Sequence, residues 1–213
     1  MYRSKINGKT LLVYLLGNVV LAFGVCLNTK TALGVSPVTS VAFNISQITA
    51  VPFGVINFFY LCVLIGIQYL LLKGAFQRFQ LTQILASFLS SFFLQLFDDL
   101  IVLPQALPIR LLALVIGVAL TGFGASLTVG MRLIPNPADA LAETVGRVLH
   151  RPFGFGKNVL DSIAITVSIV LGLFFKGSFL GIGIGTVVAM ALTGRVIALC
   201  HPWTERLYQR LID

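Results

Sequence analysis

Six apolar segments, each about 20 residues long, constrain the fold of this chain more than any other feature of its sequence. An α-helix of about 20 mostly apolar residues spans the hydrocarbon core of a bilayer. With 57% hydrophobic and only 10% charged residues, a soluble domain of 213 residues would lack the charged side chains that its surface needs. We therefore predict an all-α membrane protein whose six transmembrane helices occupy residues 10–29, 53–72, 80–102, 109–131, 155–175 and 179–199.

The basic residues are distributed unevenly between the two sides of such a bundle. If the amino terminus lies inside, eleven of the 15 lysines and arginines fall on the inner side, and Arg195 lies within the last span. Only Lys30, Arg110 and Lys176 then lie outside. Cytoplasmic loops are rich in Lys and Arg, so this bias predicts that both termini are cytoplasmic. It also accounts for the net charge of +8 without a nucleic-acid partner, because no basic cluster with interleaved aromatic residues occurs.

The second half of the chain repeats the first at an offset of 100 residues. The matched residues include Leu11-Leu12 with Leu111-Leu112, Phe23-Gly24 with Phe123-Gly124, Pro37 with Pro137, and Pro52-Phe53-Gly54 with Pro152-Phe153-Gly154. Shared prolines and glycines at one spacing indicate a shared backbone, because each of them meets a specific conformational need. The sequence therefore predicts a single membrane domain, 1–213, built from repeat 1 (1–104) and repeat 2 (105–213).

Each predicted repeat contains three spans and one short segment led by proline, residues 36–48 or 136–149. Because three is odd, the two repeats would cross the membrane in opposite directions, which is the inverted-repeat arrangement of many secondary transporters. The short segments are too short and too polar to span the bilayer. We therefore expect each of them to be a half-helix after the first span of its repeat. A plain bundle of duplicated helices without a transport role is the alternative.

Both short segments carry a stripe of polar side chains at helical spacing. The candidate substrate-binding residues in these segments are Ser36, Thr39, Asn44, Asn136, Asp139 and Glu143. A half-helix inside a membrane protein must face protein or a water-filled cavity, and its amino end offers free amide hydrogens and a positive dipole. The segments therefore predict a binding site between the two repeats. The alternative for each is an amphipathic helix on the membrane surface, with its polar stripe in water.

Lys157 and Asp161 lie four residues apart near the inner end of the fifth span, a spacing that permits an ion pair. Ionisable groups within spans are costly, so Asp161 is a candidate for proton coupling or substrate contact, and a structural ion pair is the alternative. The three cysteines are isolated, and no metal-binding spacing occurs. Nothing in the sequence resembles a nucleophile–base pair or a phosphate-binding loop. We therefore expect no enzyme activity, no metal and no cofactor.

Three short motifs, LGVSP after the first span, PFG before the second and GIGT at the start of the last, resemble the bacterial YczE/YyaS/YitT-type integral membrane proteins. The similarity extends over nearly the whole chain and includes its duplication. In that family the short segment after the proline usually carries an aspartate, which corresponds here to Asp139, whereas Thr39 occupies that place in repeat 1. The resemblance implies the architecture described above and a location in the bacterial cytoplasmic (inner) membrane, but no particular activity.

Together these features predict a small multi-pass transporter or permease for a small molecule, with its binding site at the interface of the two repeats. Two other functions fit the sequence. One is a substrate-capture subunit that needs a separate energising complex, and the other is a structural or regulatory membrane protein that carries nothing. The predicted partners are the lipid bilayer and a small-molecule substrate. The sequence leaves open whether the chain forms a homo-oligomer or binds a partner subunit.

Overall fold

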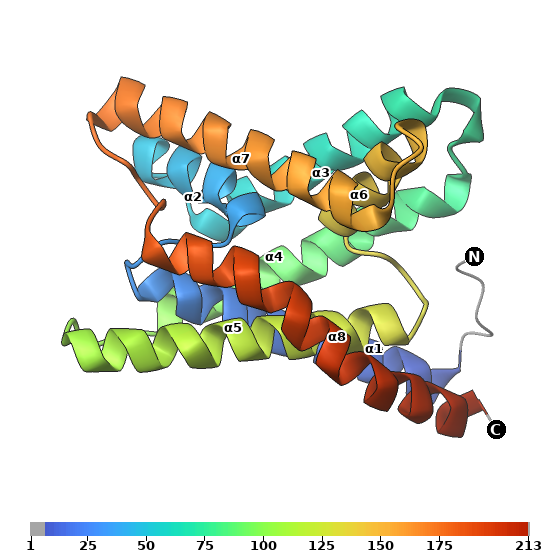
Figure 1. Cartoon of the computed structure of the whole chain (residues 1–213). Coiled ribbons are helices and arrows are strands. Elements are labelled where there is room, and N and C mark those ends of the chain that lie inside the picture. The colour runs from blue at the N-terminus through green and yellow to red at the C-terminus, as the bar shows by residue number, and fades with distance from the viewer. Residues whose placement is uncertain (1–6, 213) are drawn as a thin grey trace.

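The computed structural model describes residues 7–212, which form helices joined by short loops, with no strand among them. The helices are α1 (Gly8–Lys30), α2 (Pro37–Thr49), α3 (Phe53–Leu72), η1 (Lys73–Ala75), η2 (Arg78–Thr82), α4 (Gln83–Leu100), α5 (Leu107–Gly130), α6 (Pro137–Val148), α7 (Phe153–Lys176) and α8 (Ile184–Ile212), where η marks a short 3₁₀ helix (Figure 1). Six of them, α1, α3, α4, α5, α7 and α8, are long and apolar enough to cross a membrane, α3 and α4 together with the adjoining 3₁₀ turns. The predicted all-α class with six transmembrane helices is therefore confirmed.

The same order of elements, one long helix, one short and two long, occurs in both halves of the chain. The turns repeat as well. Left-handed residues follow the first long helix and the short helix of each half, with φ values of 50° and 53° at Ala32 and Arg132 and of 57° and 53° at Ala50 and His150. Residues with a Cβ rarely adopt this conformation, so its recurrence at the same offset indicates that the two halves share their turns as well as their apolar pattern.

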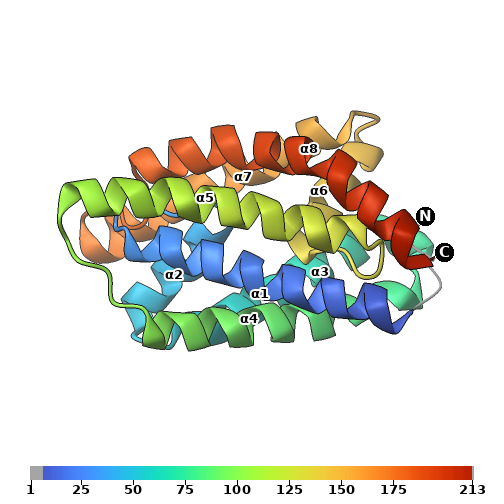
Figure 2. The same cartoon turned by 90° about the horizontal axis from the view of Figure 1, so that it is seen from below.

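The two halves of the chain interlock. α1 and α5 pack against each other along the middle of one layer, with α4 beside α1 and α8 beside α5 (Figure 2). The short helices lie in a second layer with α3 and α7 (Figure 1). There α2, from the first half, packs against α7, and α6, from the second half, packs against α3. Each short helix is therefore held in place by both halves of the chain.

Glycines bring α1 and α5 close together. A Cβ added at Gly24 would lie 2.5 Å from the backbone nitrogen of Thr121 and 2.8 Å from the carbonyl oxygen of Gly117. A Cβ added at Gly124 would lie 2.8 Å from the carbonyl oxygen of Gly17. Real Cβ atoms essentially never come within 3.0 Å of a neighbouring heavy atom in this way. The backbones of the two helices can therefore approach this closely only because these positions lack a side chain.

α8 differs from its predicted range of 179–199 at both ends. It starts later because Gly181 adopts a left-handed φ of 66° and accepts a 2.8 Å backbone hydrogen bond from Val35, which holds this segment as a loop against the first half. It continues further because the side chain of Tyr208 is buried in an apolar cluster with Met131. Tertiary contacts therefore decide both ends of this helix.

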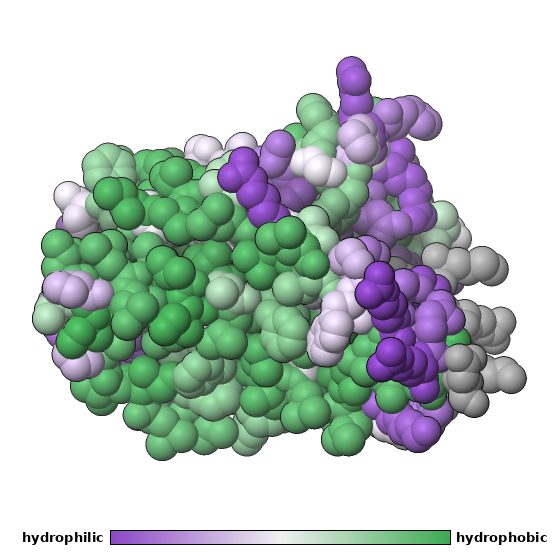
Figure 3. All heavy atoms as spheres, turned by 60° about the horizontal axis from the view of Figure 1, so that its bottom comes forward, coloured by the Kyte–Doolittle hydropathy of each residue, from purple (hydrophilic) through white to green (hydrophobic). Residues whose placement is uncertain are grey.

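On the face drawn in Figure 3, the surface is divided into an apolar belt and a polar end. Large apolar side chains on the spanning helices are exposed, such as Leu70 at 70% and Phe174 at 81%. The polar end carries both ends of the described chain, where the side-chain amide of Asn7 donates a 3.0 Å hydrogen bond to the carbonyl oxygen of Leu211. An exposed apolar belt of this kind requires a lipid environment.

Candidate functional site: a cavity beside the two short helices

Each short helix begins at a proline, Pro37 in α2 and Pro137 in α6. Proline suits the first helical turn because an N–H group at this position would have no acceptor within the helix. Asn136 caps α6, because its side-chain oxygen accepts a 2.9 Å hydrogen bond from the amide of Ala138. Ser36 precedes α2 but makes no such side-chain hydrogen bond. The amino end of α2 therefore keeps backbone amides that no capping side chain satisfies.

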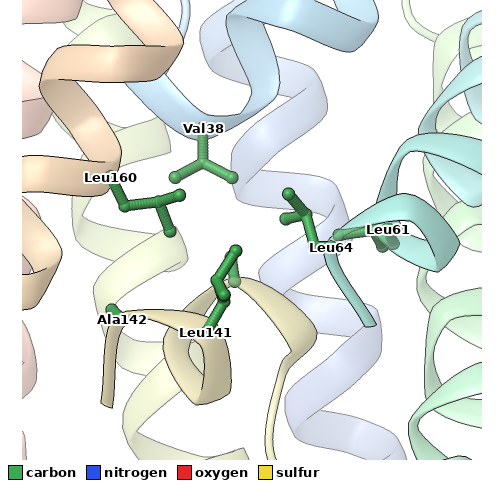
Figure 4. Packing of buried hydrophobic residues seen from close by; sticks show 7 residues of the cluster. Val38, Leu61, Leu64, Leu141, Ala142 and Leu160 are labelled. Atoms are coloured by element: carbon green, nitrogen blue, oxygen red, sulfur yellow. The ribbon is translucent and has the colours of Figure 1, made fainter. Parts of the chain in front are cut away.

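The two short helices meet in the interior of the protein through an apolar cluster (Figure 4). Val38 of α2 and Leu141 of α6 lie across from each other, with Leu160 of α7 and Leu64 of α3 completing the contact. None of these four side chains is more than 7% exposed. This packing holds the first turns of α2 and α6 in one region of the bundle.

A cavity of about 700 Å³ lies beside the amino ends of both short helices. All eight α-helices contribute residues to its wall. Ligand pockets usually have volumes of roughly 300–1,000 Å³. The polar and charged residues on the wall are Ser36, Thr39, Asn57, Ser90, Thr121, Asn136, Asp139, Glu143, Lys157, Asn158, Asp161 and Thr193.

The cavity brings together most of the residues that the sequence predicts for a binding site. Five of the six candidates on the short helices line it, namely Ser36, Thr39, Asn136, Asp139 and Glu143. Asn44 lies elsewhere, because its fully buried side chain donates a 2.7 Å hydrogen bond to the carbonyl oxygen of Ser168. Ser40, also on the stripe, contacts the hydroxyl of Ser168 at 2.6 Å. The first turn of α2 therefore faces the cavity, whereas the rest of its stripe joins α2 to α7.

Two of the three carboxylates on the wall have a charged partner. Lys157 Nζ lies 2.8 Å from Asp161 Oδ1, with the Asp161 side chain 6% exposed and the Lys157 side chain 31% exposed. Glu143 pairs with Arg147 at 3.1 Å, and both side chains are exposed. Asp139 makes no hydrogen bond and no ion pair with the described part of the chain. It is the one wall carboxylate without a direct partner among residues 7–212.

The surroundings of Asp139 disfavour its charged form. Burial raises the pKa of Asp139 above its ordinary value, the positive charge of Lys157 opposes this rise, and the negative charge of Asp161 adds to it. Asp139 also lies in the first turn of α6, where the helix dipole favours a negative charge. Burial therefore favours the protonated form of Asp139, and the helix dipole partly opposes this effect.

The structure adds polar residues that the sequence analysis does not identify. Asn57 and Asn158 line the cavity from α3 and α7, and Ser90 and Thr193 line it from α4 and α8. Asn57 is an isolated polar residue within an apolar span, whereas Ser90 lies beside Ser91 and Asn158 lies beside Lys157. The duplication holds a usable signal, because Lys73-Gly74 corresponds to Lys176-Gly177 at an offset of 103 residues, and this offset also matches Ser90 with Thr193.

One end of the cavity, away from the chain termini, is sealed by loops from both halves. The backbone amide of Val35 donates to the carbonyl oxygen of Gly181 at 2.8 Å, and the amide of Gly185 donates to that of Leu33 at 2.7 Å. Arg110 donates two further hydrogen bonds, of 2.6 and 3.0 Å, to backbone carbonyls just before Leu33. Hydrogen bonds between backbones therefore tie the loop after α1 to the start of α8.

The opposite end of the cavity is open. Glu143 and Phe153, on its wall near the turn between α6 and α7, are exposed, and so is Met190 of α8. α3 packs against α4, but the corresponding helices of the second half, α7 and α8, are scarcely in contact. Exposed wall residues therefore open the cavity beside α7 and α8, and the turn between α6 and α7 lies at the end of the bundle that carries the termini (Figure 1).

Breaking the seal is expected to expose the cavity at both ends. A Cβ at Gly185 would lie 2.6 Å from the carbonyl oxygen of Gly34, so Gly185→Leu should push α8 away from the loop. In a cysteine-free background, we expect Thr193→Cys to react with a membrane-impermeant maleimide from one face of the membrane alone. Adding Gly185→Leu should allow labelling from both faces, measured in membrane vesicles of both orientations.

The matched control for the seal is Gly66→Leu, because an added Cβ at this helical glycine would meet nothing within 4 Å. Labelling in this control should stay confined to one face. Labelling from both faces before any glycine is replaced would contradict a sealed end.

Comparison with known proteins places the chain in a family. Residues 8–202 match the family model DUF6198, described as a family of unknown function. This range covers both short helices and the spanning helices in full, except for the last part of α8. The chain matches no curated protein and no solved structure. The resemblance to the YczE/YyaS/YitT-type proteins is not tested by this match and stays a prediction. Because the match covers nearly the whole chain, the protein belongs to the family DUF6198.

Proposed function

We propose that this protein is a transporter or permease that carries a small molecule through the cavity. The observation that carries the proposal is that equivalent residues of both halves line one cavity. The pairs, each 100 residues apart, include Leu21 and Thr121, Val25 and Ala125, Ser36 and Asn136, Val38 and Ala138, Thr39 and Asp139, Asn57 and Lys157, and Leu61 and Asp161. In transporters built from inverted repeats, the substrate site lies at the interface of the repeats, beside interrupted helices.

The contacts between α1 and α5 support an inverted-repeat arrangement. Gly24 approaches Gly117, and Gly124 approaches Gly17, so each contact is made twice with the roles of the two halves exchanged. Reciprocal contacts of this kind are what a two-fold axis produces. The reciprocal packing of α2 on α7 and of α6 on α3 supports the same axis. In this arrangement each span of the first half crosses the membrane in the direction opposite to the corresponding span of the second half.

The sealed and open ends support a mechanism of alternating access. At present α3 packs on α4, whereas α7 and α8 are separated at the open side of the cavity. If a two-fold axis relates the two halves, a second state follows when the halves exchange their conformations. In that state the cavity is closed at its present opening and open at its present sealed end. α7 would then close on α8, and the loops that meet at Val35 and Gly181 would separate.

The proposed orientation puts both chain termini and the open end of the cavity in the cytoplasm. The charge distribution supports it, because Arg132 pairs with Glu205 near the carboxyl end of α8 and therefore lies at the end with the termini. The resemblance to the YczE/YyaS/YitT-type proteins supports the bacterial cytoplasmic membrane as the location. The structure then represents a state open to the cytoplasm.

Reconstitution in liposomes tests the proposal directly. Purified protein in liposomes is incubated with a defined mixture of small metabolites, and the solutes taken up are identified by mass spectrometry. Gly194→Trp should reduce the uptake to that of protein-free liposomes, because Gly194 lines the cavity and has open space around it for a large side chain. Gly66→Trp is the matched control, since Gly66 also has open space but does not line the cavity.

The same experiment separates the two other functions. Binding of a solute without uptake would identify a capture subunit that depends on a partner. Neither binding nor uptake of any solute would favour a structural or regulatory membrane protein. Crosslinking in the native membrane would then show whether the chain assembles with copies of itself or with a different subunit.

A further inference from the structure

The charges on the cavity wall do not cancel. Four charged residues line the cavity, and the Lys157–Asp161 pair, at 2.8 Å, is neutral as a whole. Glu143 is neutralised by Arg147 at 3.1 Å. Asp139 alone keeps no direct partner within the described residues, so the wall together with Arg147 carries one excess negative charge when Asp139 is ionised.

A carboxylate in this partly buried position is stabilised by a counter-charge. Removing an unpaired charge from water is costly, and the cost is offset only by a close partner of opposite sign or by a change of protonation. The dipole of α6 favours the charge at Asp139 only weakly by comparison. Asp139 is therefore expected to hold either a proton or a bound cation.

The charged groups all belong to the second half of the chain. At the equivalent positions, the first half has Thr39, Asn57 and Leu61, none of which is charged. Leu21 and Leu94 continue this neutral wall on α1 and α4. A ligand in the cavity thus meets a charged wall from α6 and α7 and a largely apolar wall from α1 to α4.

These features favour an organic cation over a metal ion. A metal ion needs several ligands close together, and no group of three His, Cys, Asp or Glu side chains among the described residues could hold one. The volume of about 700 Å³ and the apolar wall suit a molecule with a hydrocarbon body. A single carboxylate suits one ammonium group.

We propose that the cavity binds a small organic ammonium compound, whose charged nitrogen pairs with Asp139 and whose apolar body lies against the wall formed by α1 to α4. That such a compound is also the molecule carried across the membrane rests on the proposed function. The binding itself does not depend on transport.

Thermal stabilisation of the purified protein tests the binding. The probes are 2-phenylethylammonium, tetraethylammonium and the uncharged 2-phenylethanol, because a ligand of the folded state raises its apparent stability by mass action. We expect at least one ammonium probe to stabilise the wild type and the alcohol to have no effect. Asp139→Asn should weaken the binding by roughly 10-fold to 100-fold, the range for a hydrogen-bonded charge. Asp99→Asn is the matched control, because Asp99 is absent from the cavity wall and receives a hydrogen bond from Gln95.

A second measurement uses the wild type alone and does not depend on the folding of a variant. The affinity for the ammonium probe should fall as the pH falls through the pKa of Asp139, which burial raises above its ordinary value. The other charged groups on the wall are Lys157 and Asp161 of α7 and Glu143 of α6. The proposal would be overturned if neither ammonium probe bound. It would also be overturned if the affinity for the ammonium probe did not depend on pH, did not exceed the affinity for 2-phenylethanol, or did not change in Asp139→Asn.

The outcomes also separate this inference from the proposed function. Ammonium binding through Asp139 without uptake into liposomes would leave the inference standing and contradict transport by this protein alone. Uptake of a different class of solute, without ammonium binding, would leave the proposed function standing and overturn the inference.

Discussion

Lys157→Met is expected to destabilise the folded protein by about 3–5 kcal/mol, the usual cost of removing one partner from a buried ion pair. The carboxylate of Asp161 is 6% exposed and has Lys157 as its charged partner at 2.8 Å. Without the ammonium group, this carboxylate would stay buried and uncompensated. The effect is measured as the change in free energy of unfolding during titration with sodium dodecyl sulfate in mixed micelles.

The opposite substitution should cost less. Asp161→Asn leaves the Lys157 ammonium, whose side chain is 31% exposed and lines the cavity, where it can be solvated. We expect a loss of about 1.5 kcal/mol, typical of one hydrogen bond to a charged group. The double variant Lys157→Met, Asp161→Leu should recover most of the stability, because it leaves no buried charge. Equal effects of the two single substitutions would show that Asp161 is no less solvated than Lys157 in the membrane-embedded protein.

Gly24→Ala is expected to have a comparably large effect through packing alone, a loss of about 3 kcal/mol, at the upper end of the usual range for overpacked sites. The added Cβ would lie 2.5 Å from the backbone nitrogen of Thr121. A backbone atom cannot turn away as a flexible side chain can, so α1 and α5 would have to separate. The same titration measures the loss.

Gly66→Ala is the control for this prediction, since its Cβ would meet no atom within 4 Å in α3. It should be neutral or should stabilise by up to about 1 kcal/mol, because alanine favours a helix more than glycine does. Gly124→Ala should resemble Gly24→Ala, since Gly124 makes the reciprocal contact near Gly17. If Gly24→Ala were as harmless as Gly66→Ala, the close approach of α1 and α5 would not be important for stability.

Much of the architecture can be predicted from local features of the sequence. The length of each apolar run indicates a span, and Pro37 and Pro137 mark where the short helices begin. The second span, predicted at 53–72, has those same bounds in α3. The last span, predicted at 179–199, is wrong at both ends because its limits depend on contacts with the first half of the chain.

The candidate site can be predicted only in part. The polar stripes identify Asp139 and its neighbours because these lie in short segments where polar residues are conspicuous. They also suggest Asn44, which is turned toward Ser168 instead. They do not reveal Asn57, because a single polar residue in a long apolar helix has no preferred direction in the sequence itself.

The sequence by itself determined the helical class, the six spans, the two short helices and the duplication, because these depend on local hydropathy, on proline and on spacing. Only the tertiary structure decided which polar residues share the cavity, which carboxylate stays without a partner, and which end is sealed. The physical reason is that the sequence does not determine how each helix is rotated about its own axis. Successive residues of a helix point about 100° apart, so the side chains that meet depend on how each helix is turned. That turn is decided by contacts between distant segments, such as Gly24 with Gly117.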